Sequence, residues 1–293
     1  MAEFNPEQFS GNFEQNPLRK YFRQPKIHIP LPSKGQYYPE GSIEMPETGE
    51  VPVFAMTAKD ELTMKTPDAL LNGAATVDVI KSCVPAIKDP WKMPTLDLDA
   101  LLIAIRIATY GETMEISTPI PGTTESRKFD VDLRKILNKL VSATYIDTVT
   151  MNELTVYTKP LTYREFTQTS LKTFEEQRVF AIINNDNMSD EEKIDKFGES
   201  FKKLTDLTVK VLNKSIAKII VGDTEVTNQK HIDEFMENSD KEFYKFIMDH
   251  LEEQRKMFEI EPLKVTSTEE DQAKGAPEEW EVPITFDSSN FFG

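Results

Sequence analysis

The most apolar stretch of the chain predicts a single buried helix near its middle. Residues 95–111 contain the run LDLDALLIAIRIATY, in which apolar side chains fall on nearly every side of a helix. Such a helix is buried all round rather than half-exposed. The run is shorter than the roughly 20 apolar residues that span a membrane, and Arg106 interrupts it. Gly111 follows as a helix stop, so we expect a central helix wrapped by the rest of a domain.

Short helices are expected to lead into this central helix. Three threonines stand where N-caps belong, at Thr57, Thr66 and Thr76, because their hydroxyls can accept backbone N–H groups. Prolines at positions 85, 90 and 94 then interrupt the chain before the central helix begins. The pattern predicts a compact cluster of short helices.

Extended runs on both sides of this cluster predict short strands. Before it, KIHIPL, SIEM and VPVFAM are separated by turn-rich sequence, which predicts a small antiparallel sheet. After Gly111, MEIST and RKFDVDL are typical of two strands joined by a Pro/Gly-rich turn. A short amphipathic helix, LRKILNKLV, and one more strand, ELTVYTKP, complete the first half.

Helical periodicity dominates the second half. Three capping boxes open helices there: Thr162 with Glu165, Ser189 with Glu192, and Ser239 with Glu242. The first two helices are predicted at Tyr163–Asn184 and at residues 190–220, and their short connection favours an antiparallel hairpin. Each helix is expected to have an apolar side, which on the second helix follows steps of three and four. These sides comprise Phe166, Leu171, Phe174, Ile182 and Ile183 in the first, and Ile194, Phe197, Phe201, Leu204, Thr208, Val211, Ile216 and Ile219 in the second.

Together these patterns predict an α+β protein that is mainly α-helical. A small antiparallel β region and a cluster of short helices surround the buried central helix, and a helical hairpin or bundle follows. We expect four segments, which are a disordered arm at residues 1–24, an α+β core domain at 25–160, a helical domain at 161–260, and a linker with an aromatic C-terminal motif at 261–293.

Aromatic residues gather near both ends of the chain and are candidate partner contacts. The C-terminal candidates are Trp280, Phe286, Phe291 and Phe292, and the secondary N-terminal ones are Phe4, Phe9 and Phe13. Large aromatic side chains concentrate at the energetic centres of interfaces. Two alternatives stay open, because the C-terminal aromatics could fold back on the core and the N-terminal arm could be an unattached tail.

Charge and cysteine content narrow the function classes. The net charge is −16, with 50 acidic against 34 basic residues, and no Lys/Arg cluster occurs, which disfavours nucleic acid as a partner. A single cysteine, Cys83, excludes an internal disulfide framework and a multi-cysteine zinc site. The N-terminal sequence lacks the pattern of a signal peptide, and no apolar run reaches membrane-spanning length. We therefore expect a protein of the reducing cytoplasm.

Motifs of catalysis are not found. The glycines form no phosphate-binding loop and no nucleophile elbow. The histidines, His28, His231 and His250, lie far apart and are expected at the surface or in interfaces. Cys83 is interpreted as a small buried hydrophobe, and Asp97 and Asp99 as helix-start carboxylates rather than a calcium loop. We expect no enzyme, no cofactor, no metal and no small-molecule substrate.

Arg106 is a charge embedded in the most apolar run of the chain. A buried guanidinium needs a partner, because desolvation of an unpaired charge is costly. It could anchor a carboxylate of another protein, or it could pair within the chain or extend to the surface. We favour the structural interpretation, and we likewise assign structural roles to Gly111, Thr162 and Glu165.

Several motifs resemble one family as a set. The run AMTAKDELTMKTPDALLNGAATVDVIKSCVPAIKDPWKMPTLDLDALLIAIRIATYGE, the helix start LTYREF, the turn IIVGDTEVT and the closing PITFDSSNFFG are similar to the baseplate hub proteins of T4-like tailed bacteriophages. The resemblance begins near Phe22 and continues, with variable patches, to the C-terminal end. In one departure, residues 264–277 lack the cysteine pairs that some relatives carry, so metal binding is not carried over.

The resemblance implies a non-enzymatic tail protein that acts in assembly of the central baseplate hub through protein–protein binding. The implied partners are other hub proteins and the tape-measure protein, and the implied location is the host cytoplasm during assembly or the tail baseplate of the virion. A structural subunit would stay in the mature virion, whereas an assembly factor would leave it. The alternatives are a chaperone or adaptor for a long helical partner and, as a distant third, an enzyme that uses dispersed carboxylates.

Overall fold

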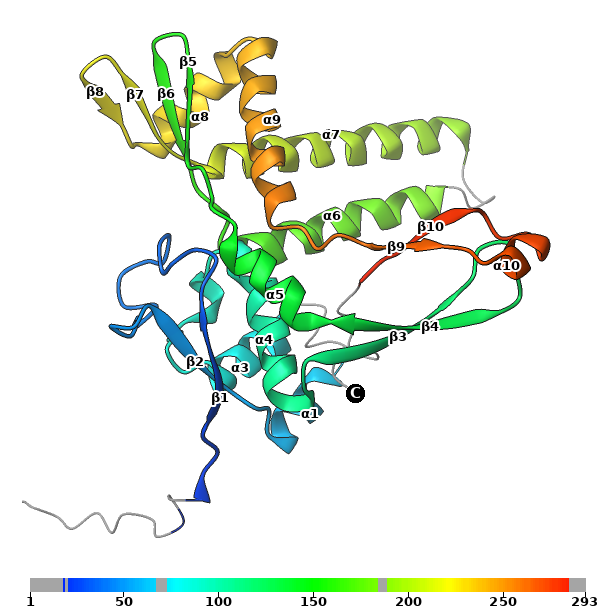
Figure 1. Ribbon diagram of the computed structural model, residues 1–293. Coiled ribbons are helices and arrows are strands. Elements are labelled where there is room, and N and C mark those ends of the chain that lie inside the picture. Colours follow the sequence, from blue (N-terminus) through cyan, green and yellow to red (C-terminus); the bar gives the residue numbers. More distant parts are fainter. Residues whose placement is uncertain (1–17, 19–20, 67–72, 184–188, 285–293) are drawn as a thin grey trace, which may run out of the picture.

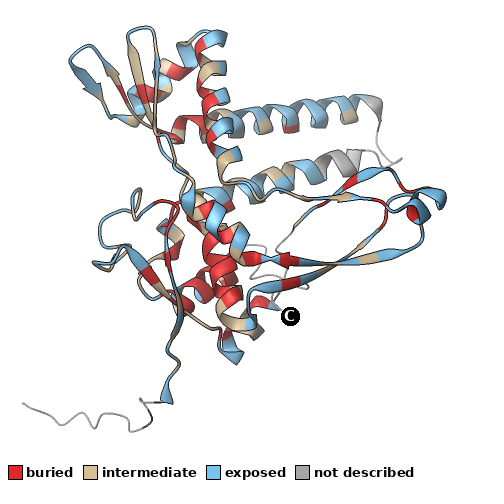
Figure 2. Ribbon diagram, viewed as in Figure 1, coloured by how far each residue is buried: buried red, intermediate tan, exposed pale blue. Residues whose placement is uncertain are grey.

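A helix near the middle of the chain forms the centre of the largest hydrophobic core, as the sequence predicts. The computed structural model describes residues 18, 21–66, 73–183 and 189–284. The central helix is α4 (Leu98–Tyr110), of which seven residues are buried. It ends at Gly111, whose φ of 95° is a backbone conformation that favours glycine. Figure 2 shows the buried residues concentrated around α4.

Short strands and helices surround α4. They are β1 (Pro25–Pro30), β2 (Glu50–Phe54), α1 (Ala58–Met64), α3 (Ala74–Cys83), two 3₁₀ turns, η3 (Pro90–Lys92) and η4 (Thr95–Asp97), and α5 (Leu133–Ser142). The strands β1 and β2 pair antiparallel. Thr57 caps α1 as predicted, in a capping box with Asp60. Thr76 instead lies inside α3, whose N-cap is Gly73, while Thr66 precedes residues outside the described part.

A four-stranded antiparallel sheet forms a second unit with its own core. It has the order β5 (Thr148–Met151), β6 (Leu154–Thr158), β7 (Ile216–Val221) and β8 (Thr224–Val226). Helices α8 (Gln229–Asn238) and α9 (Lys241–Met257) pack beside it, as Figure 1 shows. The sheet joins strands from both sides of the boundary expected at residue 160. The helix predicted to continue to residue 220 was too long, because Ile216 and Ile219 belong to β7.

Two long helices form the predicted hairpin. They are α6 (Tyr163–Ile183) and α7 (Asp190–Lys214), which lie side by side in Figure 1. The capping boxes at Thr162 and Ser189 are confirmed, since Glu165 and Glu192 each accept from the backbone N–H of their N-cap. The third box is wrong. Asp240, not Ser239, caps α9 and accepts from the N–H of Phe243.

The expected linker after residue 261 is an ordered part of the fold. It contains β9 (Leu263–Thr266), α10 (Glu269–Ala273) and β10 (Glu279–Val282), and it lies beside the hairpin of β3 (Thr113–Pro119) and β4 (Ser126–Asp132). We call these two hairpins the hairpin arm, as distinct from the N-terminal arm of residues 1–24. Within it, the buried carboxylate of Asp271 lies 2.5 Å from Arg127 Nη2 and accepts from Thr268. These contacts hold the segment in place, because they satisfy the charge of a buried carboxylate. The composition of the segment gave no reason to expect a buried charge.

The α+β class is confirmed. Helices account for 48% and strands for 22% of the structure, and the sheets are small and antiparallel. Within the described ranges, no helix is both long and apolar enough to cross a membrane.

Candidate protein-binding surface

The N-terminal half of α7 exposes apolar residues that the sequence pattern groups on one side of the helix. Ile194 is 70% exposed, Phe197 52% and Phe201 62%, and the two phenyl rings stack at 6.4 Å between centroids. Ser200, between them on the helix, is only 2% exposed. The helix therefore buries a small polar residue at this level and turns its large apolar side chains outward. Figure 2 shows most of this part of α7 as exposed.

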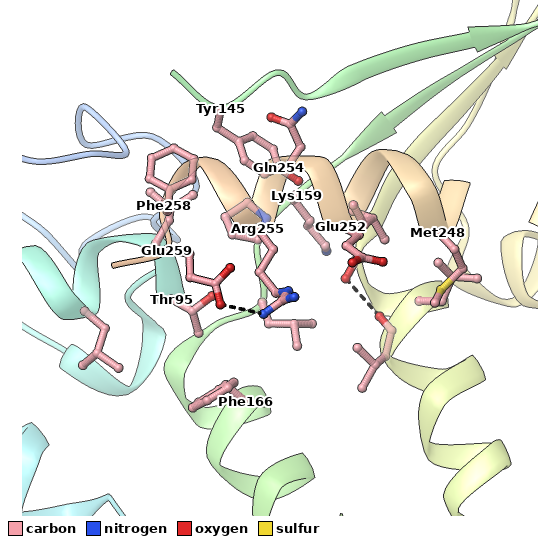
Figure 3. A pocket seen from close by; sticks show the side chains of 18 of the residues that line it. Thr95, Tyr145, Lys159, Phe166, Met248, Glu252, Gln254, Arg255, Phe258 and Glu259 are labelled. Carbon is pink, nitrogen blue, oxygen red and sulfur yellow. Dashed lines mark hydrogen bonds and ion pairs between the residues drawn. The ribbon is translucent and has the colours of Figure 1, made fainter. Parts of the chain in front are cut away.

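The same side of α7 continues into a groove between helices. The groove has a volume of about 720 Å³ and is lined by the start of α4, by α6, by the last turns of α7 and by α9. Figure 3 shows Phe166, Met248 and Phe258 among the side chains around it. Thr208 and Val211 contribute from α7. Most of these lining groups are apolar, which is the usual character of a binding cleft.

We name the shared side of this helix the α7 stripe. It comprises Ile194, Phe197, Phe201, Leu204, Thr208 and Val211, which follow one another in steps of three and four. At a rise of about 1.5 Å per residue, the stripe is about 25 Å long. Its N-terminal part is exposed, and its C-terminal part forms a wall of the groove. Stripe and groove thus form one continuous apolar surface.

Ion pairs join three of the charged groups around the groove to a partner, whereas Lys159 and Asp99 have none within the described residues. Arg255 lies 3.5 Å from Glu259, and Glu252 lies 3.0 Å from Lys256. Asp99, at the start of α4, lines the groove and has no hydrogen bond or ion pair within the described chain. Burial raises the pKa of Asp99 to about 6. The groove therefore holds a partly desolvated carboxylate without a partner.

The neighbouring carboxylate of Asp97 has a structural role instead. It is fully buried and accepts hydrogen bonds from the N–H of Ser33 (2.7 Å), the hydroxyl of Ser33 (2.6 Å) and the hydroxyl of Tyr38 (2.9 Å). It stands at the N-cap position of α4, as expected of a helix-start carboxylate, but its side chain makes no capping hydrogen bond to that helix. Burial raises the pKa of Asp97 to about 6, although the three hydrogen bonds act to lower it.

The predicted aromatic contacts are only partly within the described residues. Trp280 is buried and packs edge-on against Phe129, with 5.9 Å between ring centroids. Trp280 therefore packs within this chain. This is the alternative that was left open for the C-terminal aromatics, which could fold back on the core. The other candidates lie outside the described residues: Phe4, Phe9, Phe13, Phe286, Phe291 and Phe292.

Arg106 is placed without the carboxylate partner that burial led us to expect. Its guanidinium lies over the ring of Tyr110, 4.6 Å from the centroid. Its Nε and Nη1 atoms are buried with no hydrogen-bond acceptor in the described part of the chain. Desolvation lowers the pKa of this group. A cation–π contact thus takes the place of an ion pair.

The groups with catalytic potential are held in inert settings. Cys83 is fully buried, and burial together with the charge of Asp60 raises its pKa to about 11, which keeps the thiol protonated at neutral pH. His250, expected at the surface or in an interface, is 8% exposed, with its Nε2 3.5 Å from the hydroxyl of Thr158. Across the described ranges, no group of three His, Cys, Asp or Glu could hold a metal ion.

The residues of the α7 stripe were not predicted as partner contacts, for a physical reason. A stripe of apolar residues in steps of three and four has the same pattern whether it faces a core or a partner. Asp99 carried no signal beyond its position at a helix start.

The chain matches one protein family over most of its length. The family model described as T4 bacteriophage base plate protein matches residues 25–274. The chain therefore belongs to this family, and its role is that of a structural protein of the phage baseplate, in a family that is typically non-enzymatic. Baseplate membership implies binding to other baseplate proteins of the phage. Searches of curated proteins and of solved structures give no match.

Proposed function

We propose that this chain acts in assembly of the central hub of the baseplate, by binding other phage proteins and without catalysing a reaction. It serves either as a hub subunit or as an assembly factor in the host cytoplasm. The resemblance of its motifs to baseplate hub proteins supports the hub rather than another part of the baseplate. Its net charge of −16 disfavours a role that requires contact with DNA.

The α7 stripe is the observation that carries this proposal. Soluble monomers rarely leave several large apolar side chains exposed side by side, because each Å² of apolar surface kept in water forgoes about 25 cal/mol. Ile194, Phe197 and Phe201 are all more than half exposed. A partner that covers them gains this free energy on binding. The stripe is therefore the docking surface we assign to hub assembly.

A chaperone or adaptor for a long helical partner, such as the tape-measure protein, is the second candidate. The observation in its favour is the shape of the surface, since a straight stripe of about 25 Å that ends in a groove suits a helix better than a globular face. The aromatic residues outside the described ranges, Phe4, Phe9, Phe13, Phe286, Phe291 and Phe292, are proposed as additional contacts.

Mass spectrometry of purified virions separates the two roles. Stoichiometric amounts of the chain in the virion would assign a hub subunit. Its absence from virions, with abundant protein in the infected-cell lysate, would assign an assembly factor or chaperone. A phage that lacks the chain and still forms complete baseplates in normal yield would overturn both.

A further inference from the structure

We propose that the α7 stripe and the groove together receive one basic amphipathic helix of another protein. The helix lays apolar side chains along the stripe and places a Lys or Arg against Asp99 in the groove. This inference rests on the proposed function, to which it adds the chemistry of the partner. It follows from the continuity of the two surfaces and from the unpaired carboxylate of Asp99 in the groove.

The position of Asp99 selects a cation. A carboxylate that is partly removed from water needs an opposite charge or several donors, and the described chain supplies neither to Asp99. Two cations line the groove: Arg255 is paired with Glu259, and Lys159 makes no ion pair with Asp99 or with another described carboxylate. An incoming guanidinium or ammonium would satisfy Asp99 in a water-poor setting, where such pairs contribute most to specificity. A neutral apolar segment would leave the carboxylate buried and unsatisfied.

The geometry of the stripe selects a helix. Its residues recur in steps of three and four over about 25 Å. A second helix of about 17 residues with an apolar seam at the same spacing would match the stripe in both length and pattern. The phenyl rings of Phe197 and Phe201 stack on each other and are more than half exposed, so they project from the helix as a ridge. Such a ridge packs into a groove between side chains of a facing helix.

The segments of this chain outside the described residues offer few cations, because only Arg19 and Lys20 lie there, next to the acidic residues 1–17. Residues 1–17 contain three glutamates and neither Lys nor Arg, and residues 285–293 contain one aspartate and neither Lys nor Arg. Residues 67–72 and 184–188 also lack both. A second copy brings a net charge of −16 and is repelled at long range. Opposite charge therefore favours a different, basic protein.

Photo-cross-linking in infected cells identifies the occupant. A photoreactive phenylalanine analogue replaces Phe201 in the full chain, and a control chain carries it at Asp206, an exposed residue of α7 outside the stripe. We expect position 201 to cross-link to a helical segment with apolar residues in steps of three and four and at least one Lys or Arg. A cross-link to this chain itself, to an acidic or cation-free segment, or to nothing would overturn the proposal.

A double-mutant cycle then tests the charge pair. The cross-linked segment is made as a peptide with its cation intact or replaced by glutamine, and its affinity for the full chain is measured by fluorescence anisotropy. For the wild type and for the matched control Asp206→Asn, we expect loss of the cation to weaken binding about tenfold or more. For Asp99→Asn, the loss should be less than about twofold. Equal losses in all three proteins would overturn the pairing.

The two proposals fail separately. If the occupant lacks a cation but substitution of the stripe still blocks hub assembly, the partner chemistry is wrong and the proposed function stands. If a basic helix binds as described but baseplates form without this chain, the proposed function is wrong. The yield of complete baseplates and the peptide affinities are independent readouts.

Discussion

Asp97 and Asp99 stand two residues apart at the start of α4 and have opposite surroundings. Asp97 is fully buried and accepts three hydrogen bonds from Ser33 and Tyr38. Asp99 lines the groove and has no partner in the described chain. Burial raises the pKa of both carboxyls to about 6. One carboxylate thus holds the fold together, and the other is available to a ligand.

Asp97→Asn should destabilise the protein strongly. The amide keeps one acceptor oxygen but turns an NH₂ group toward donors that Asp97 now satisfies, and this site has no access to water. Leaving buried donors unsatisfied costs about 1–3 kcal/mol each, so we expect a loss of about 2–4 kcal/mol. Urea unfolding followed by circular dichroism measures it. A loss below about 0.5 kcal/mol would contradict the assigned network.

Asp99→Asn should stabilise the free protein at neutral pH. The pKa of an unfolded aspartate is about 3.9, and folding raises that of Asp99 to about 6. The folded state therefore binds this proton more tightly. The resulting stabilisation is complete below about pH 4 and is lost as the pH rises through 6. Removing the charge should add about 1–2 kcal/mol at pH 7.

The gain from Asp99→Asn should shrink to nothing near pH 4, which urea titrations at several pH values will show. The other charged groups that line the groove are Lys159, Glu252, Arg255 and Glu259, and they are the same in both proteins. Asp97 titrates in both as well, so the difference isolates Asp99. A gain that is the same at pH 4 and pH 7 would contradict the assignment.

Phe201→Ser and Phe197→Ser should leave the folded chain intact. Both side chains are more than half exposed, so their removal costs the protein little buried apolar surface. We expect changes in the free energy of unfolding within about 0.5 kcal/mol. Phe243→Ser is the matched control, because Phe243 is 6% exposed and its loss should cost about 3–5 kcal/mol. Equal losses at all three positions would place the stripe in the core.

Gly122→Ala should disrupt the hairpin arm. Gly122 has a φ of +77°, and a Cβ there would lie 2.3 Å from the backbone oxygen of Gly275. Backbone cannot move aside as a side chain can, so the two hairpins must separate. Gly49→Ala is the control, with a φ of +75° and no atom within 4 Å of the added Cβ.

Differential scanning calorimetry of the two glycine variants separates the two costs. We expect about 1 kcal/mol for the backbone strain in Gly49→Ala and at least about 2 kcal/mol more for Gly122→Ala. Similar losses for the two variants would mean that the close approach to Gly275 contributes nothing.

Arg106→Met should cost little stability. The guanidinium gains a contact with the ring of Tyr110, but two of its buried nitrogens have no acceptor in the described chain. Replacing a poorly satisfied buried charge by an apolar side chain of similar length is often neutral or stabilising. Thermal unfolding should show no loss. A loss of about 3 kcal/mol or more would point to a partner for this charge.

Local rules predicted the parts of the fold that depend on neighbours in sequence. The burial of α4, its end at Gly111 and the capping boxes at Thr162 and Ser189 all follow from spacing within one or two turns. The rule failed at Ser239, because Asp240 is an equally good cap one residue later. It also failed at Ile216 and Ile219, whose spacing suits a helix until a partner strand, β6, is available.

Contacts between distant segments were beyond the sequence. The ion pair between Arg127 and Asp271 and the packing of Trp280 on Phe129 join residues more than 140 apart. No local pattern announces them, so an ordered hairpin was taken for a linker. The same limit applies to the site, because only the packing of α6 on α7 decides that Phe197 and Phe201 face outward.

The most direct test of the central claim is the yield of complete baseplates in cells where the only copy of this chain carries Phe197→Ser and Phe201→Ser. We expect the double variant to accumulate as folded protein while complete baseplates, counted by electron microscopy of purified lysates, fall at least about tenfold below the wild type. A normal baseplate yield with the double variant would contradict the claim that the α7 stripe is the surface through which this protein acts.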